Sequence, residues 1–197
     1  MSTFQCKPHA TIDRDGAFVA SYGSPPVTAT NMWDFGAIKS GIREGRVLDE
    51  FRNSVLPVWL ADSSLVLAFY ADPEVRKYDR SGRMVWTTAL ADPVLDHAFS
   101  EFVRRNIEEP NPARIYSLNY ITDALATDEE VWFLLAGSEG APAVILCLDS
   151  DTGRLLRRRV VHGVAPARAF ALDEEQGRLY IANGADASLS VAVLPDG

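Results

Sequence analysis

The feature that most constrains this chain is a recurring unit of short strands and tight turns, which is clearest in Leu56–Leu90. Four runs of apolar, β-branched and aromatic residues alternate there with three turns rich in Asp, Ser, Pro and Gly. Runs bounded in this way are typical of strands joined by tight turns. The segment therefore predicts an antiparallel sheet of four sequential strands. Such a sheet, when it recurs along a chain, is the blade of a β-propeller.

The turns of this unit recur at regular spacing. The first turn falls at Asp62, and equivalent turns fall at Asp128 and Asp173, which are 45 residues apart. A period of about 45 residues is typical of propeller blades. Asp62 and Asp128 are 66 residues apart, which is one period plus an insertion of 21. The last turn of the unit ends at a glycine each time, at Gly16, Gly82, Gly153 and Gly197.

The repeat predicts an all-β fold, namely a β-propeller of four-stranded antiparallel blades with one connector helix at about 92–108. Blade parts are expected at 9–22, 56–90, 120–161 and 167–197, with long connectors at 23–55 and 91–119. We interpret residues 1–197 as a single, incomplete propeller domain. The pattern begins in the middle of one blade and stops at the turn before a fourth strand.

The two connectors differ in how clearly they predict a helix. In the second, Asp92 is a favourable N-cap and Pro93 suits the first helical position. Apolar residues then recur every three or four positions, which gives one apolar stripe along a helix. In the first connector Gly41 and Gly45 argue against a long helix, so we interpret it as a loop with a short helix near 47–51.

The inner strands of the units are apolar on both faces, as expected of strands that lie between neighbouring sheets. Large side chains at matching repeat positions are therefore predicted to be buried between blades. These side chains are Trp59, Phe69, Trp132, Leu134 and Phe170.

Composition narrows the classes of partner. The formal net charge of −8 opposes binding to nucleic acid, and no basic stripe offsets it. The longest apolar run, Val131–Ala136, is far shorter than the ~20 residues of a membrane span. No signal peptide is visible at the start of this chain, and the compartment stays open because a longer parent could carry one. Cys6 and Cys147 give no reason to expect a disulfide.

The residues that most often carry chemistry form no recognisable site in this sequence. His9, His97 and His162 lack the spacing of metal ligands, and no nucleophile motif is present. The run at 157–159 of three arginines is interpreted as a charged sheet edge that resists aggregation. No catalytic residue, metal site or cofactor is therefore predicted.

A weaker candidate site lies where the first strand of each blade begins, because these positions meet at one mouth of a propeller channel. Two arginines, an aspartate and two amides there could bind an anionic or polar ligand. The alternative is that these side chains only solvate the channel. The residues are Arg52, Asn53, Asn119, Asp123 and Arg168.

Three segments resemble the six-bladed propellers of the NHL and TolB-like type: Ile12–Gly23, Val75–Trp86 and Phe170–Asn183. They read IDRDGAFVASYG, VRKYDRSGRMVW and FALDEEQGRLYIAN. The resemblance implies a fold whose members mostly act as binding platforms, while some related propellers are hydrolases or lyases. Six blades would need about 270 residues at the period found here, so this chain holds about three and a quarter blades.

Two functions stay open at this point. The favoured one is a non-enzymatic binding or scaffold module that recognises a protein or a small polar ligand at its loop face. The alternative is a fragment of a metal-dependent hydrolase similar to the gluconolactonase and strictosidine-synthase-like families, in which Asn53, Asn119 and Asp123 would be the contributors to a metal site. Open blade faces also lead us to expect a homodimer.

Overall fold

The computed structural model describes residues 9–12, 18–22, 31, 33–137, 141–164, 166–184 and 186–194, with the side chains of 9–12, 18–22 and Glu50 left out. Cys6, the turn at 13–16 and Gly197 lie outside the described residues, and so does the side chain of His9. The chain forms two compact units. The first comprises Met1–Leu90 with Phe99–Leu118, and the second comprises Ala91–Ala98 with Asn119–Gly197.

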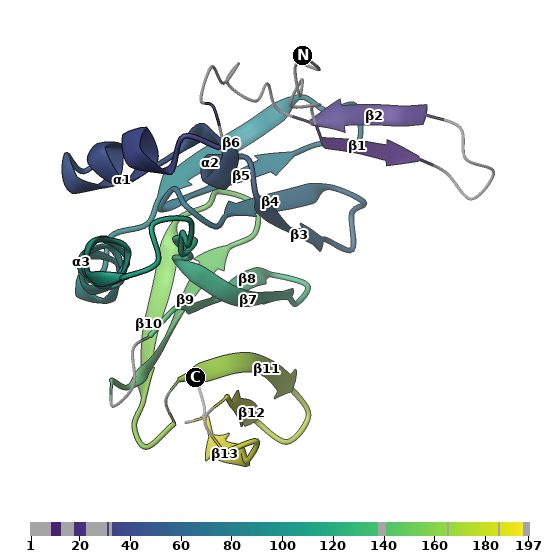
Figure 1. Cartoon of the computed structure of the whole chain (residues 1–197). Coiled ribbons are helices and arrows are strands. Elements are labelled where there is room, and N and C mark those ends of the chain that lie inside the picture. The colour runs from purple at the N-terminus through teal and green to yellow at the C-terminus, as the bar shows by residue number, and fades with distance from the viewer. Residues whose placement is uncertain are drawn as a thin grey trace. The chain divides into compact units, whose positions relative to one another are not determined.

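The described residues of the first unit form one four-stranded sheet and one hairpin. The sheet has the order β3–β4–β5–β6, with every neighbouring pair antiparallel (Figure 1). Its strands are β3 (Val55–Trp59), β4 (Leu65–Phe69), β5 (Glu74–Tyr78) and β6 (Met84–Ala89). The hairpin pairs β1 (His9–Ile12) with β2 (Phe18–Tyr22).

The second unit contains a four-stranded and a three-stranded sheet, again antiparallel and in sequence order. Each sheet has the up-and-down strand order of a propeller blade, so the predicted all-β fold class is confirmed, and the described residues form thirteen strands. The strands are β7 (Ile121–Ala126), β8 (Glu130–Leu135), β9 (Ala143–Asp149), β10 (Leu155–Val161), β11 (Ala167–Asp173), β12 (Arg178–Asn183) and β13 (Leu189–Val193).

The turn between the last two strands is built alike in both four-stranded sheets. The carboxylate of Asp79 accepts a hydrogen bond from the Ser81 N–H at 2.9 Å, and that of Asp149 accepts one from the Thr152 N–H at 2.8 Å. The glycines that follow, Gly82 and Gly153, have φ values of 81° and 70°. Glycine adopts this left-handed conformation without a steric penalty. The recurring Asp and Gly are therefore structural residues of the repeat.

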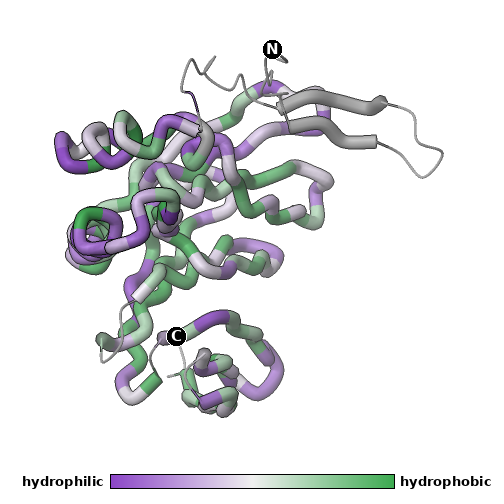
Figure 2. Tube along the Cα trace, in the orientation of Figure 1, coloured by the Kyte–Doolittle hydropathy of each residue, from purple (hydrophilic) through white to green (hydrophobic). Residues whose placement is uncertain are grey.

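The core follows the inner strands, as predicted. Figure 2 shows hydrophobic residues along the strands and many hydrophilic ones in turns and helices. Trp132, Leu134 and Phe170 are buried, and Phe69 is half-buried. Trp59 is 53% exposed, so its predicted burial is wrong. Trp59 is the last residue of the edge strand β3 and has a neighbouring strand on one side only.

The predicted connector helix is present as α3 (Pro93–Glu108), and the Asp92 carboxylate accepts a hydrogen bond from the Val94 N–H at 3.0 Å. Phe102 on this helix packs edge-to-face on Phe51, with 6.4 Å between ring centroids. Asn106 is fully buried, and its side chain bonds the backbone of Tyr116, which fixes the segment after α3. No helix among the described residues is long and apolar enough to cross a membrane.

The first connector holds more helix than the sequence predicted. It contains α1 (Phe35–Arg43) and α2 (Asp49–Arg52), and the predicted short helix coincides only with α2. Gly45, which was interpreted as evidence against a helix, ends α1 in the left-handed conformation with φ of 80°. The N–H of Arg46 donates to the Gly41 carbonyl at 2.8 Å, which is the hydrogen bond of a glycine-terminated helix end.

Candidate functional site

The three consecutive arginines of β10 point to both faces of their sheet, because side chains alternate along a strand. Arg158 lies on one face and pairs with the Asp92 carboxylate, with 2.5 Å between Nε and Oδ2. Burial alone would raise the pKa of Asp92, but hydrogen bonds from Arg158 and Val94 bring that pKa below its ordinary value. Arg157 and Arg159 lie on the opposite face. The three arginines therefore place positive charge on an edge strand, and Arg158 also forms a specific ion pair with Asp92.

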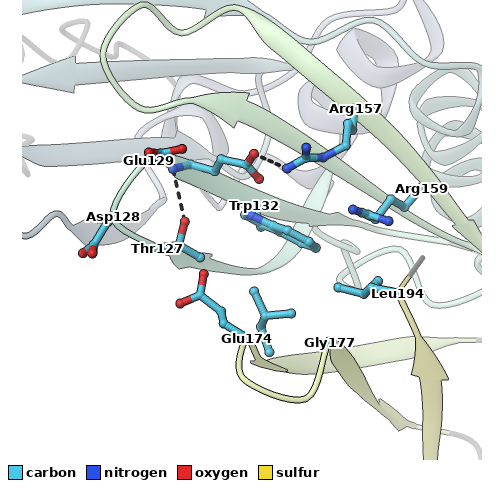
Figure 3. Close-up of a pocket in the computed structure, with 11 residues that line it drawn as sticks. Thr127, Asp128, Glu129, Trp132, Arg157, Arg159, Glu174, Gly177 and Leu194 are labelled. Atoms are coloured by element: carbon cyan, nitrogen blue, oxygen red, sulfur yellow. Dashed lines mark hydrogen bonds and ion pairs between the residues drawn. The ribbon is translucent and has the colours of Figure 1, made fainter. Parts of the chain in front are cut away.

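Arg157 and Arg159 line a pocket of about 440 Å³ within the second unit (Figure 3). Four segments contribute to it: the turn between β7 and β8 with the start of β8, the middle of β10, the end of β11 with the turn that follows it, and the residue after β13. The lining residues are Thr127, Asp128, Glu129, Glu130, Trp132, Arg157, Arg159, Leu172, Glu174, Gly177 and Leu194.

One side of the pocket is acidic. The carboxylates of Asp128, Glu129 and Glu174 make no hydrogen bond or ion pair with the described residues. Asp128 departs from the repeat, because the equivalent Asp62 and Asp173 accept hydrogen bonds from the backbone of their own turns at 2.8 and 3.0 Å. In the β7–β8 turn the Thr127 hydroxyl oxygen performs this role, accepting from the Glu130 N–H at 3.2 Å. The Asp128 carboxylate is thereby left to the pocket.

The deeper side of the pocket carries hydrogen-bond donors. Trp132 is 3% exposed, and the Arg159 guanidinium lies 5.2 Å from the centroid of its ring. The Trp132 Nε1–H and the Arg159 Nε–H are buried and have no hydrogen-bond partner within the described part of the chain. Buried donors in folded proteins are nearly always paired, since leaving one unpaired costs about 1–3 kcal/mol. Arg157 is already engaged, because it forms an ion pair with Glu130.

A buried thiol lies on the same face of the sheet, beneath the pocket. Cys147 pairs in register with Trp132 on β8 and with Arg157 on β10. Burial raises the pKa of the Cys147 thiol, so the reactive thiolate is disfavoured. This cysteine is part of the buried core cluster of the second unit.

Two of the predicted site residues lie in the first unit. Arg52 is the last residue of α2, and its Nε lies 3.3 Å from a carboxylate oxygen of Asp72. Burial raises the pKa of Asp72 while Arg52 opposes this shift. Asn53 caps the C-terminal end of α2. Both residues therefore contribute to the end of a helix.

The other three predicted residues lie in the second unit. Asp123 on β7 accepts a hydrogen bond from the Phe170 N–H on β11 at 2.9 Å, so its carboxylate joins two sheets. Arg168 is exposed, and its side chain covers Gly184, where an added Cβ would lie 2.4 Å from Arg168 Cγ. Asn119 is exposed beside the start of β7. The predicted set thus divides between the two units, and the pocket contains none of its members.

Within the described ranges, no group of three or more histidine, cysteine, aspartate or glutamate side chains could hold a metal ion. The hydrolase alternative would use Asp123 as a ligand, and the oxygens of that residue already accept backbone hydrogen bonds from Ala124 and Phe170.

The sequence comparisons give no family: no protein-family model matches the chain, and none of the curated proteins matches it. The chain is similar in structure to several solved proteins at low sequence identity. Kuenenia stuttgartiensis hydrazine synthase gives a TM-score of 0.43 at 10% identity, over 70% of this chain and 31% of that chain. A protein of unknown function from Bacteroides caccae gives 0.41 at 13% identity, over 70% and 44%. The Dos1 propeller gives 0.35 at 8% identity, over 95% and 53%.

This chain therefore spans about a third to a half of the length of the solved structures that it resembles. Their TM-scores lie below 0.5, and it is the antiparallel, sequential strand order of the chain's own sheets that shows the blade architecture.

Proposed function

We propose that this chain is a non-enzymatic binding module of the propeller type, and that its recognition site is the pocket between β8, β10 and the β11–β12 turn. The observation that carries the proposal is the pair of buried donors, Trp132 Nε1–H and Arg159 Nε–H, that lack a partner among the described residues. A ligand oxygen would pair them. We further propose that the blades belong to a six-bladed propeller of the NHL or TolB-like type, as the sequence resemblance implies.

The departure of the β7–β8 turn from the repeat supports this choice of site. Asp128 occupies a position whose equivalents stabilise their own turns, yet Thr127 has taken over that task. A carboxylate without a structural role beside unpaired donors is typical of a binding site. The channel-mouth residues remain a prediction with weaker support, because Arg52 and Asp123 already have partners within the protein.

A homodimer remains part of the proposal. Its support is the edge strand β13, where three alternate apolar side chains, Leu189, Val191 and Val193, are 62%, 55% and 76% exposed. Apolar side chains in a row on an edge strand favour association with another sheet.

The proposal is tested by NMR on the ¹⁵N-labelled chain, which has four tryptophan indole N–H signals. Trp132→Phe assigns the signal of Trp132 and leaves the other three as internal controls. Three probes are added separately: a capped basic tetrapeptide, a capped acidic tetrapeptide and inorganic phosphate. We expect at least one probe to shift the Trp132 signal to saturation. If all three leave that signal unchanged at millimolar concentration, the pocket is not a binding site of this kind.

A further inference from the structure

The charges around the pocket favour a cationic ligand. Its lining contains four carboxylates and two guanidinium groups. Glu130 and Arg157 neutralise one another, which leaves the carboxylates of Asp128, Glu129 and Glu174 opposite the single charge of Arg159. The whole chain also carries a net charge of −8. A small free anion is repelled by this field, whereas a cation is attracted.

A cation alone does not satisfy the hydrogen-bond donors of the pocket, which need an acceptor. The Trp132 indole N–H and the Arg159 Nε–H can only donate, so they need an acceptor oxygen. An ammonium or guanidinium group has no acceptor, and a polyamine therefore leaves both donors unpaired. A free phosphate or carboxylate has acceptors but meets the acidic rim. A lysine or arginine residue within a peptide supplies both groups, since its backbone carbonyl is an uncharged acceptor.

The walls of the pocket suit such a residue. Leu172, Leu194 and the ring of Trp132 line it beside the charged groups. Lysine and arginine bury their methylene stems on apolar surface while the charged end stays among polar groups. The volume of about 440 Å³ lies within the range of small-ligand pockets, about 300–1,000 Å³.

We infer that the pocket binds a basic peptide segment of a partner protein. Its lysine or arginine side chain lies among the carboxylates of Asp128, Glu129 and Glu174, and a backbone carbonyl accepts from the Trp132 indole and Arg159. This inference rests on the proposed function, because it names the ligand class of the same site.

The test measures the affinity of a capped tetrapeptide with two adjacent lysines, followed through the indole signals of the full chain. We expect Glu174→Gln and Asp128→Asn each to weaken binding about two- to fivefold, as the loss of an exposed ion pair predicts. Trp132→Phe, followed through backbone amides of the β7–β8 turn, should weaken binding about three- to tenfold by removing one donor. Raising the salt concentration should weaken binding to the unmodified protein.

Glu175 provides a matched control, because it is exposed in the same turn as Glu174 but does not line the pocket. Glu175→Gln removes the same charge and should change the affinity by less than Glu174→Gln does. Thermal unfolding of each variant establishes that it is folded.

The outcomes separate the inference from the proposed function. Stronger binding of a matched peptide with two glutamates, or of phosphate, overturns the basic-peptide inference and leaves a binding pocket in place. Equal losses in Glu174→Gln and Glu175→Gln also overturn the inference, because the attraction is then unspecific. A Trp132 signal that none of the probes shifts removes the proposed function itself.

Discussion

At the scale of single residues, the same amino acid has two kinds of role in this repeat. Asp79 and Asp149 stabilise tight turns, and so does Asp62. Asp128 falls at a repeat position and has no such contact among the described residues, because Thr127 replaces it. The sequence shows several similar turn aspartates, and only the hydrogen bonds tell which of them is available to a ligand.

The turn aspartates make stability depend on pH. Asp79 accepts hydrogen bonds from the hydroxyl and N–H of Ser81 and from Arg83, and these lower its pKa to about 2. A lowered pKa in the folded state means that the stabilisation is complete above the unfolded pKa of about 3.9. It is lost as the pH falls from there through about 2, where the folded-state carboxyl takes up its proton.

We therefore predict that Asp79→Asn lowers the melting temperature at pH 7 and that its difference from the unmodified protein shrinks between about pH 4 and pH 2. Thermal unfolding of both proteins across this range measures the effect. Asp128→Asn is the control, since its carboxylate has no partner in the described structure, and it should show no such convergence. A difference for Asp79→Asn that stays constant down to pH 2 would contradict the assigned role.

At the scale of elements, the start of α3 depends on one carboxylate. Asp92 is 8% exposed, accepts from the Val94 N–H and pairs with Arg158 on β10. The sequence predicts the N-cap, since Asp before Pro at the start of an apolar stripe is a local signal. It does not predict the ion pair, because Arg158 lies 66 residues further along the chain.

Removal of this carboxylate is expected to destabilise the protein. Asp92→Ala removes the cap and leaves Arg158 without its partner, and we predict a loss of about 1–2 kcal/mol in the free energy of unfolding. Urea denaturation is measured for Asp92→Ala, for Arg158→Gln and for the double variant. The three free energies give the coupling energy between Asp92 and Arg158. His97→Ala, at an exposed position of the first turns of α3, should change stability by less than about 0.5 kcal/mol. An equally small effect of Asp92→Ala would show that α3 begins without this cap.

The helix that the sequence did not predict shows why local reasoning failed in the first connector. Asp34 caps α1 by accepting from the Ala37 N–H at 2.9 Å, and Gly45 ends it. Both signals are present in the sequence. They were outweighed by Gly41, which lies inside the helix and is buried there. A glycine lowers the helix propensity of a segment, but the tertiary packing of a buried helix can override this preference.

At the scale of the whole molecule, the sequence predicts the strands well because strand length, turn residues and repeat spacing are local properties. The pocket is different, since its walls come from the β7–β8 turn, the middle of β10, the end of β11 with the turn after it, and the residue after β13. The arginines of β10 and the turn aspartates are recognisable in the sequence, but nothing in it indicates that they line one pocket. No local pattern predicts that Trp132 and Arg159 will each leave a buried donor without a partner among the described residues.

The central claim is that this propeller-type chain recognises its partner through the pocket around Trp132. The most direct measurement is the set of intermolecular NOEs between the ¹⁵N-labelled chain and the unlabelled basic tetrapeptide. We predict NOEs from the Trp132 indole N–H and from the β7–β8 turn amides to the peptide. NOEs confined to residues near the predicted channel mouth, such as Asp123 and Arg168, with none to Trp132, would contradict the claim.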